Sequence, residues 1–222
     1  MLVPLPWRSV PALVCGFGSR SAAPPPGTIL LEEQLHGTAV IDPEGLAARI
    51  DSRDGLPLVD ARGDALIARR GGMVVGVRTA DCVPLLLVAT SQRWAAAVHA
   101  GWRGTLAGIA AKAVEAAKAG GIEPRDLAAA LGPSIGPCCY EVSTELAASF
   151  RDAGLPVVAA TQSGKPHLDL RAANRLLLER SGVGAANIFD AAPCTRCASD
   201  VYHSFRADPS AGGRQISWIG WA

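Results

Sequence analysis

An excess of charge of either sign is missing from this sequence. Its 222 residues contain 21 Lys and Arg against 20 Asp and Glu, so the formal net charge is +1. Nucleic acids and acidic membrane surfaces attract proteins through concentrated positive charge. We therefore expect neither kind of partner and look first for a small-molecule site.

Long hydrophobic runs are missing as well, because no stretch reaches the roughly 18 uninterrupted apolar residues of a membrane-spanning helix. The opening stretch MLVPLPWRSVPALVCGFGSR holds three prolines and no basic segment of the kind that begins a secretory signal.

The chain is nonetheless 49% hydrophobic, which is typical of a globular protein, and its length fits one domain over residues 1–222. We expect a cytoplasmic protein, in which six cysteines are more typically free, metal-bound or reactive than paired in disulfides.

Strand and helix patterns are interleaved without a strict strand–helix–strand repeat, which favours an α/β or α+β fold with a mixed sheet. Residues 42–63 are polar and predict a surface loop. Apolar runs predict strands over 31–41, 64–89 (three short strands), 94–100, 127–131 and the end of 201–222. Helices are predicted over 104–121, 143–154 with Ser143 as its cap, and 169–182 with Asp169 as its cap.

Histidine is scarce, with only four in the chain, and two of them lie where predicted strands end. His36 precedes Gly37, His99 lies near the end of another strand, and Cys82 interrupts an apolar run in the stretch TADC. Strand ends can meet at one edge of a sheet, and two imidazoles with one thiolate suit Zn²⁺ while leaving a fourth position open. The spacing fits no local metal-binding motif, so two hydrogen-bonded histidines and a core cysteine are the alternative.

Four of the other cysteines form two close pairs. One pair is the stretch CTRC at 194–197, with His203 six residues beyond, and the other is Cys138 with Cys139. A single CxxC is weak evidence for structural zinc, and no helix follows it to lower a thiol pKa as in a redox motif. Adjacent side chains diverge, so neighbouring cysteines seldom share a metal ion. We therefore expect packing or loop positions for all four.

Backbone amides at two glycine-rich places could hold a phosphate or a sugar. The stretch GPSIGPCCYEV at 132–142 predicts a tight loop with free amides near Ser134, and Gly104 is expected to begin the alanine-rich helix beside Arg103. Arg103 supplies positive charge, and Trp102 supplies an apolar wall. Arg78 and Arg206 could join the phosphate contact, although a structural role is the simpler explanation for each.

Six segments taken together resemble the YfiH/YlmD family, whose members are also called laccase-domain or multicopper polyphenol oxidase-like proteins. The segments are QLHG (34–37), DALI (64–67), TADCVPLLL (79–87), AAVHAGWRGTLAGI (96–109), LGPSIGPCCYEV (131–142) and GRQISWIG (213–220). The resemblance implies one YfiH-like catalytic domain. Its fold would be an α/β (α+β) mixed-sheet sandwich related to the catalytic domain of cytotoxic necrotizing factor toxins. It also implies that the metal ligands are His36, Cys82 and His99.

The same resemblance implies a zinc-dependent purine nucleoside phosphorylase acting on adenosine, inosine, guanosine and 5′-methylthioadenosine, with adenosine deamination in some members. Its small-molecule partners would be a nucleoside and phosphate. We assign catalytic roles to Cys82, His99 and Arg103, and substrate or phosphate binding to Arg103, Gly104, Ser134 and Arg78.

Two other functions are weighed against this one. A Cys–His hydrolase, or an amino-acid editing enzyme for cell-wall precursors, would use Cys82 as nucleophile and His99 as base. A copper-dependent polyphenol oxidase ranks last, because four histidines cannot supply a three-copper cluster. The preferred nucleoside, the general acid and the oligomeric state are left open.

The sequence departs from the family pattern at its start and in its tail. Leu35 replaces a common valine, and only GFGSR (16–20) remains of the N-terminal motif, which leaves the substrate range open. In the tail, His203 and Ala207 replace an aromatic residue and an arginine. We expect no second zinc site made by CTRC and His203.

Overall fold

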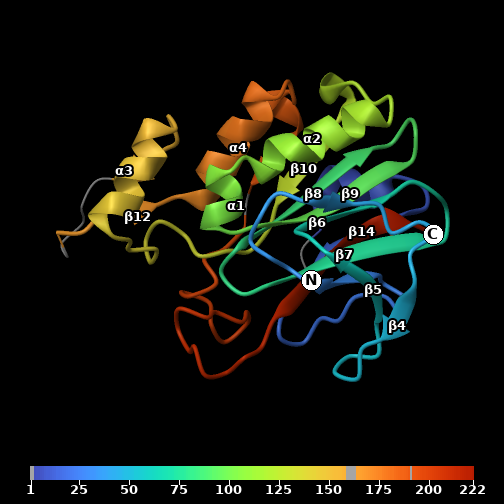
Figure 1. Ribbon diagram of the computed structural model, residues 1–222, viewed down its shortest axis with the longest axis horizontal. Helices are drawn as coiled ribbons and strands as arrows, with labels where there is room; N and C mark the ends of the chain where they lie inside the picture. The colour runs from blue at the N-terminus through green and yellow to red at the C-terminus, as the bar shows by residue number, and fades with distance from the viewer. Residues whose placement is uncertain (1–2, 159–163, 191) are drawn as a thin grey trace.

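A computed structural model of the chain describes residues 3–158, 164–190 and 192–222. Helices cover one face of a central sheet, and further strands cover the other face (Figure 1). In chain order the elements are η1 (Leu5–Ser9), β1 (Leu13–Phe17), β2 (Leu30–Glu33), β3 (Val40–Ile41), β4 (Ala48–Ile50), β5 (Pro57–Arg62), β6 (Ala65–Ala68), β7 (Met73–Thr79), β8 (Val83–Ala89), β9 (Trp94–Ala100), α1 (Trp102–Leu106), α2 (Ile109–Ala119), η2 (Pro124–Asp126), β10 (Ala128–Leu131), α3 (Thr144–Asp152), β11 (Val157–Val158), β12 (His167–Leu168), α4 (Leu170–Arg180), η3 (Ala185–Asn187), β13 (Ile188–Asp190) and β14 (Gln215–Trp221).

The central sheet has six strands in the order β13-β10-β8-β9-β6-β3. β9 lies antiparallel to both β8 and β6, and β3 runs parallel to β6. Every residue of β8 and β9 is buried, because this sheet is covered on both faces. That is why the two strands appear in the sequence as continuous apolar runs without polar alternation.

The two faces of the central sheet belong to two hydrophobic clusters. Leu85 and Leu87 of β8 face the cluster that contains α2 and α4, whereas Leu86 and Val88 face the cluster formed with β7 and β14. This alternation follows from the two-residue period of a strand. The mixed-sheet α/β fold expected from the sequence is therefore confirmed, with a helical layer and a second sheet on opposite sides.

Two three-stranded sheets and one two-stranded ribbon accompany the central sheet in the described part of the chain. β14 pairs antiparallel with β1 and with β7, so the end of the chain closes a three-stranded sheet. β5 lies between β2 and β4 in another three-stranded sheet, drawn at the lower edge of Figure 1. β11 and β12 form a two-stranded ribbon.

Three sequence predictions about elements are wrong. The strand predicted over 31–41 is divided into β2 and β3, because His36 between them has a left-handed φ of 59°. The predicted loop over 42–63 contains β4 and β5. The helix predicted over 104–121 is two helices, α1 and α2, separated by Gly108 with a φ of 85°.

The other predicted elements are confirmed with small shifts of their bounds. The region 64–89 forms β6, β7 and β8, the run 94–100 is β9, and 127–131 contains β10. Ser143 caps α3 by accepting from the amide of Leu146, and Asp169 caps α4 by accepting from that of Ala172. Within the described residues, no helix has the length and apolar character needed to cross a membrane.

Candidate metal centre and its cavity

One edge of the central sheet gathers three side chains that come from separate parts of the sequence. Pro84 of β8 lies opposite His99 of β9, so Cys82, just before β8, comes next to the end of β9. The turn between β2 and β3 brings His36 to the same edge. The donor atoms of His36, Cys82 and His99 all lie within 4.8 Å of one another. The expected convergence of these three residues is confirmed.

Asp64 forms hydrogen bonds to two of these three residues. It directly precedes β6, the strand that pairs with β9, and its residue exposure is 0%. Its Oδ1 lies 2.8 Å from Nδ1 of His99, while its carboxylate also accepts from the amides of His36 (2.8 Å) and Gly37 (2.7 Å). One carboxylate therefore fixes the His36 turn and holds the His99 ring with Nε2 as the nitrogen left for another partner.

A glycine makes room for the group. A Cβ on Gly101 would lie 3.0 Å from Sγ of Cys82 and 3.1 Å from Cδ2 of His36. The rings of His36 and His99 meet edge to face with centroids 4.6 Å apart. A side chain at Gly101 would push two of the three donors apart. This accounts for the first glycine of the stretch HAGWRG.

The electrostatics of the group favour a thiolate. Burial opposes ionisation of Cys82, but the neighbouring His36 and His99 outweigh that effect and lower the pKa of its thiol to about 6. Burial likewise opposes the charged form of His99, yet Asp64 and Cys82 raise the pKa of its imidazole to about 9. A thiolate beside two imidazoles is a donor set that fits Zn²⁺, which takes sulfur and nitrogen ligands together.

The group opens into a cavity of about 640 Å³. Trp102 and Arg103 of α1 line its wall together with Tyr140, and the Arg103 guanidinium lies 4.3 Å above the Trp102 ring. Phe205 and Arg206 line it from the tail segment that precedes β14. Aromatic faces, a cationic guanidinium and a thiolate–imidazole group thus meet around a space large enough for a nucleoside-sized molecule.

Residues 19–222 match a family described as multi-copper polyphenol oxidoreductase laccase. The chain is 40% identical over 198 residues to adenosine deaminase RL5 of an unknown prokaryotic organism, which covers 86% of this chain and 74% of that protein. It is 38% identical over 180 residues to a purine nucleoside phosphorylase of Deinococcus radiodurans, with 78% and 69% covered.

A solved structure agrees with these relatives. The crystal structure of YlmD from Geobacillus stearothermophilus aligns with a TM-score of 0.80 at 27% identity, covering 98% of this chain and 94% of that one. The chain belongs to the YfiH/YlmD family. The resemblance seen in six sequence segments is confirmed, and so is the fold that it implied.

The residues expected to bind phosphate in this YfiH/YlmD family member do not all reach the cavity. Gly104 is buried within α1, where a Cβ would lie 2.8 Å from the Gly37 carbonyl, so it serves close packing and does not begin a long helix. Ser134 is fully buried, and its hydroxyl has no partner within the described part of the chain. Arg103 and Arg206 are the arginine candidates that are exposed and line the cavity, and Arg206 already donates to the Glu141 carbonyl at 3.1 Å.

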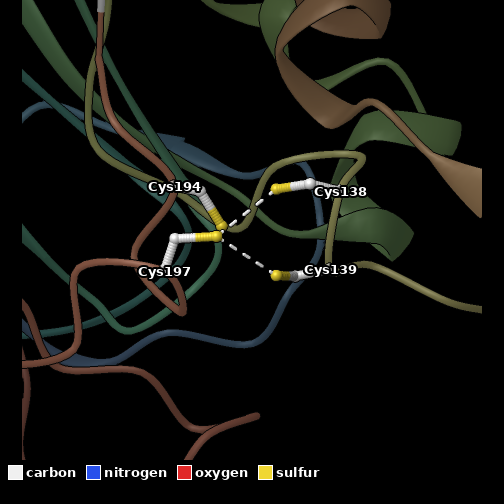
Figure 2. Close-up of side chains that lie close together, drawn as sticks. All are labelled: Cys138, Cys139, Cys194 and Cys197. Atoms are coloured by element: carbon white, nitrogen blue, oxygen red, sulfur yellow. Dashed lines mark hydrogen bonds between the residues drawn. The ribbon is translucent and has the colours of Figure 1, made fainter.

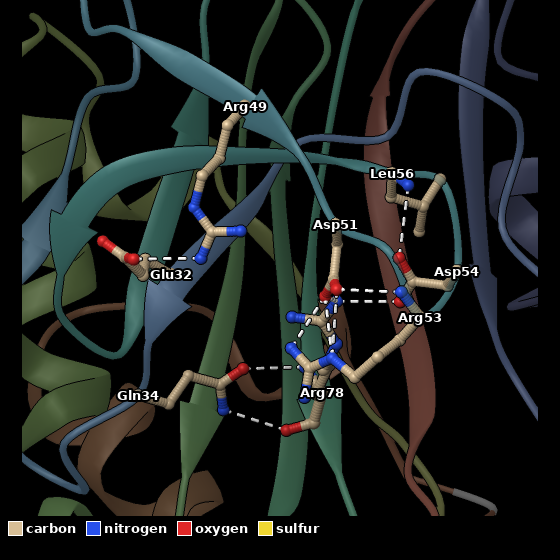
Figure 3. Close-up of polar contacts among 8 residues, drawn as sticks. All are labelled: Glu32, Gln34, Arg49, Asp51, Arg53, Asp54, Leu56 and Arg78. Carbon is tan, nitrogen blue, oxygen red and sulfur yellow. Dashed lines mark hydrogen bonds and ion pairs between the residues drawn. The ribbon is translucent and has the colours of Figure 1, made fainter.

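Arg78 lines the cavity but is already bound to two carboxylates. Its Nη2 lies 2.7 Å from Oδ2 of Asp51 and 2.7 Å from Oδ2 of Asp54, with only 15% of the side chain exposed (Figure 3). Its backbone amide and carbonyl both bond the side-chain amide of Gln34. Its charge is therefore largely neutralised, and Arg78 joins β7 to the neighbouring loops.

Sequence reasoning missed Asp64 and Tyr140. Asp64 is an acidic residue directly before the fully buried strand β6, a position that signals a bonded carboxylate, and it lies in the DALI segment. Asp81, which directly precedes Cys82, accepts from the Thr195 hydroxyl (2.6 Å) and the Arg206 amide (2.7 Å). It fixes two loops of the cavity wall, and Asp64 is the carboxylate that contacts His99.

Proposed function

We propose that this protein is a zinc-dependent purine nucleoside phosphorylase that acts on adenosine, inosine, guanosine and 5′-methylthioadenosine in the cytoplasm. The observation that carries the proposal is the convergence of His36, Cys82 and His99 at a cavity whose wall holds Arg103. The relative from Deinococcus radiodurans, named a purine nucleoside phosphorylase, supports the same activity.

The three converging side chains would hold the zinc ion as a two-nitrogen, one-sulfur set. When bound there, zinc would supply Lewis-acid polarisation of a substrate or water oxygen. Asp64 keeps the His99 ring oriented for this role through the bond at Nδ1. A multicopper oxidase is disfavoured, because the four histidines of the chain cannot supply a three-copper cluster in addition to this site.

The cavity wall would bind the two substrates. Arg103 is exposed and positively charged, so it is placed to contact a phosphate oxygen. Trp102 and Phe205 offer apolar surfaces for a purine ring. In the reaction a phosphate oxygen forms the bond to ribose C1′, the bond from C1′ to the purine nitrogen breaks, and the purine leaves with the electron pair and takes up a proton.

Tyr140 supplies a hydrogen-bond donor to the same space. Burial, together with the neighbouring Cys82, raises the pKa of its phenol to about 12. The hydroxyl therefore stays protonated at neutral pH and can donate to a ribose or purine acceptor. We expect Tyr140→Phe to raise KM more than it lowers kcat, because the interaction serves binding in both the ground state and the transition state.

Product analysis by chromatography tests the proposal. The purified protein is incubated with each nucleoside, with and without phosphate, while zinc is quantified in the same sample. Phosphate-dependent release of free base and ribose 1-phosphate is expected, with 5-methylthioribose 1-phosphate as the sugar product of 5′-methylthioadenosine. Both products should be lost in Cys82→Ala together with the bound zinc at this site. Retained turnover in a Cys82→Ala protein that lacks this zinc would overturn the mechanism.

Adenosine deamination is a second activity that the same cavity would support, because the 40% identical relative is named an adenosine deaminase. Inosine should then form from adenosine even without phosphate. The same chromatogram separates it from free base. Absence of inosine from the phosphate-free reaction would restrict the protein to phosphorolysis.

A Cys–His hydrolase is the competing function, and the Cys82–His99–Asp64 arrangement is the observation that favours it. A lowered thiol pKa, a histidine and an orienting carboxylate also make a nucleophilic site. Iodoacetamide at neutral pH distinguishes the two. The phosphorylase proposal expects Cys82 to be protected until a chelator is added, whereas immediate alkylation of the zinc-loaded protein would favour the hydrolase.

A further inference from the structure

Four cysteines meet at a second place in the fold, away from His36 and His99. Cys138 and Cys139 lie in the turn after β10, and Cys194 and Cys197 lie in the turns after β13 (Figure 2). All four sulfurs lie within 4.8 Å of one another. The sulfur of Cys197 is 3.6 Å from that of Cys138 and 3.4 Å from that of Cys139. We call these four residues the cysteine cluster.

The turn after β10 explains how two adjacent cysteines reach one point. The amides of Cys139 and Tyr140 both donate to the Gly136 carbonyl at 3.0 Å, so the backbone is coiled and not extended. Side chains diverge to opposite faces in a strand, but neighbouring side chains of a tight turn need not. The expectation that Cys138 and Cys139 diverge is therefore wrong here, and CTRC pairs with them instead of with His203.

The sulfur separations match those around a single tetrahedral ion. Zinc binds thiolates at about 2.3 Å, and tetrahedral geometry then separates the sulfurs by roughly 3.8 Å. All four thiols are free, and the sulfur–sulfur separations of 3.6 and 3.4 Å are well beyond the length of a disulfide bond. We propose that Cys138, Cys139, Cys194 and Cys197 bind a structural zinc ion that is separate from the one at the cavity.

Backbone groups around the cysteine cluster support this assignment. The Gly136 amide donates to the sulfur of Cys194 at 3.2 Å, as amides commonly do toward metal-bound thiolates. A Cβ on Gly136 would lie 3.2 Å from Cβ of Cys194 and 3.3 Å from the sulfur of Cys138, so only glycine fits this place easily.

An ion at the cysteine cluster would fasten two loops that form the cavity wall. The Thr195 amide donates to the Ser134 carbonyl at 3.0 Å, and the Ile135 amide donates to the Asp81 carbonyl at 2.9 Å. Asp81 in turn accepts from the Thr195 hydroxyl. The cysteine cluster therefore lies where the loop that carries Ile135 and Tyr140 meets the segment of Thr195. Both contact Asp81, the residue before Cys82.

Metal analysis of the reduced whole protein, purified anaerobically and then equilibrated with zinc chloride, tests the proposal. We expect two zinc ions per chain in the wild type and one in each of Cys197→Ala and Cys82→Ala. Cys15→Ala, at a buried position on β1 that belongs to neither group, is the matched control and should keep both. One zinc ion in the wild type, unchanged in Cys197→Ala, would overturn the proposal.

A second measurement does not depend on Cys197→Ala being folded. Zinc X-ray absorption of Cys82→Ala should detect one ion surrounded by four sulfurs at the tetrahedral zinc–sulfur distance. Cobalt in the same variant should give the strong sulfur-to-metal absorption of a four-thiolate site. Mixed nitrogen and oxygen ligands, or disulfides among these four cysteines in mass spectra of the anaerobically purified protein, would contradict it. Neither result depends on which reaction the protein catalyses.

Discussion

Among single residues, Asp64 makes three hydrogen bonds at the site, one to His99 and two to backbone amides of the His36 turn. In Asp64→Asn, the side-chain NH2 group would face at least one of the N–H groups that now donate to the carboxylate. We expect zinc affinity at the cavity site and kcat/KM to fall by about 10–100-fold. A chelator competition gives the affinity, and the visible spectrum of the cobalt protein reports the ligand geometry directly.

The outcome for Asp64 separates positioning from general destabilisation. Loss of stability with an unchanged cobalt spectrum and unchanged metal affinity would show that the carboxylate only supports the fold. Asp152→Asn, at an exposed position near the end of α3, is the control and should leave both readouts unchanged.

Gly101 gives a steric test of the same site. Its φ of −75° suits any residue, so the backbone tolerates alanine, but the new Cβ would crowd Cys82 and His36. We expect Gly101→Ala to fold, to bind zinc more weakly at the cavity and to lose roughly 100-fold in kcat/KM. Gly184→Ala, where the nearest atom to the Cβ is 3.6 Å away, is the control. Equal activity of the two variants would contradict this account.

The candidate donors could be predicted from the sequence because each belongs to a recognisable local pattern. His99 and Cys82 interrupt or end apolar runs, and the register of β8 with β9 then places them side by side. The partner of the Asp64 carboxylate could not be assigned in that way, since it depends on β6 pairing with β9 across a long sequence separation. The cysteine cluster was missed because turn geometry, not spacing, decides where Cys138 and Cys139 point.

At the level of elements, Gly108 divides what the alanine-rich sequence predicts to be one helix. Its φ of 85° is left-handed, and a Cβ there would meet open space. Gly108→Ala should therefore cost about 1–2 kcal/mol of unfolding free energy through backbone strain alone. Urea unfolding measures the change, while zinc content should stay unchanged. Gly108→Asn should cost less, because asparagine tolerates this region, and the reverse order would contradict the explanation.

The strands that could not be predicted from the sequence are those with few buried residues. All three residues of β4 are exposed, and β5 alternates only in part, so the region 42–63 has no apolar period to detect. β8 and β9 were evident because both faces of the central sheet are covered. Prediction from pattern therefore succeeded where burial is complete and failed where a strand is held mainly by its backbone ladder.

In the whole molecule, an ionic network joins the small sheet of β2, β5 and β4 to the larger sandwich. Asp51, just after β4, is 3% exposed and binds Arg53 in its own loop and Arg78 of β7 (Figure 3). The hydrogen bonds from Arg53 hold the pKa of the Asp51 carboxyl well below its usual range, and Arg78 adds to the effect. The network therefore contributes to folding only while the carboxylate is ionised.

The pH dependence of the unfolding free energy tests the role of this ionic network. At pH 7 we expect Asp51→Asn to lower the unfolding free energy by about 2 kcal/mol, since bonds to a buried charged group are lost. Below about pH 4, Asp51 becomes protonated in the unfolded wild type but stays ionised in the folded protein. The difference in unfolding free energy between wild type and variant therefore shrinks as the pH falls further. Urea unfolding of both proteins at pH 7, 5 and 3 measures the gap, and metal loss at low pH cancels in the difference. A gap as large at pH 3 as at pH 7 would mean that the charge of Asp51 does not hold the two sheets together.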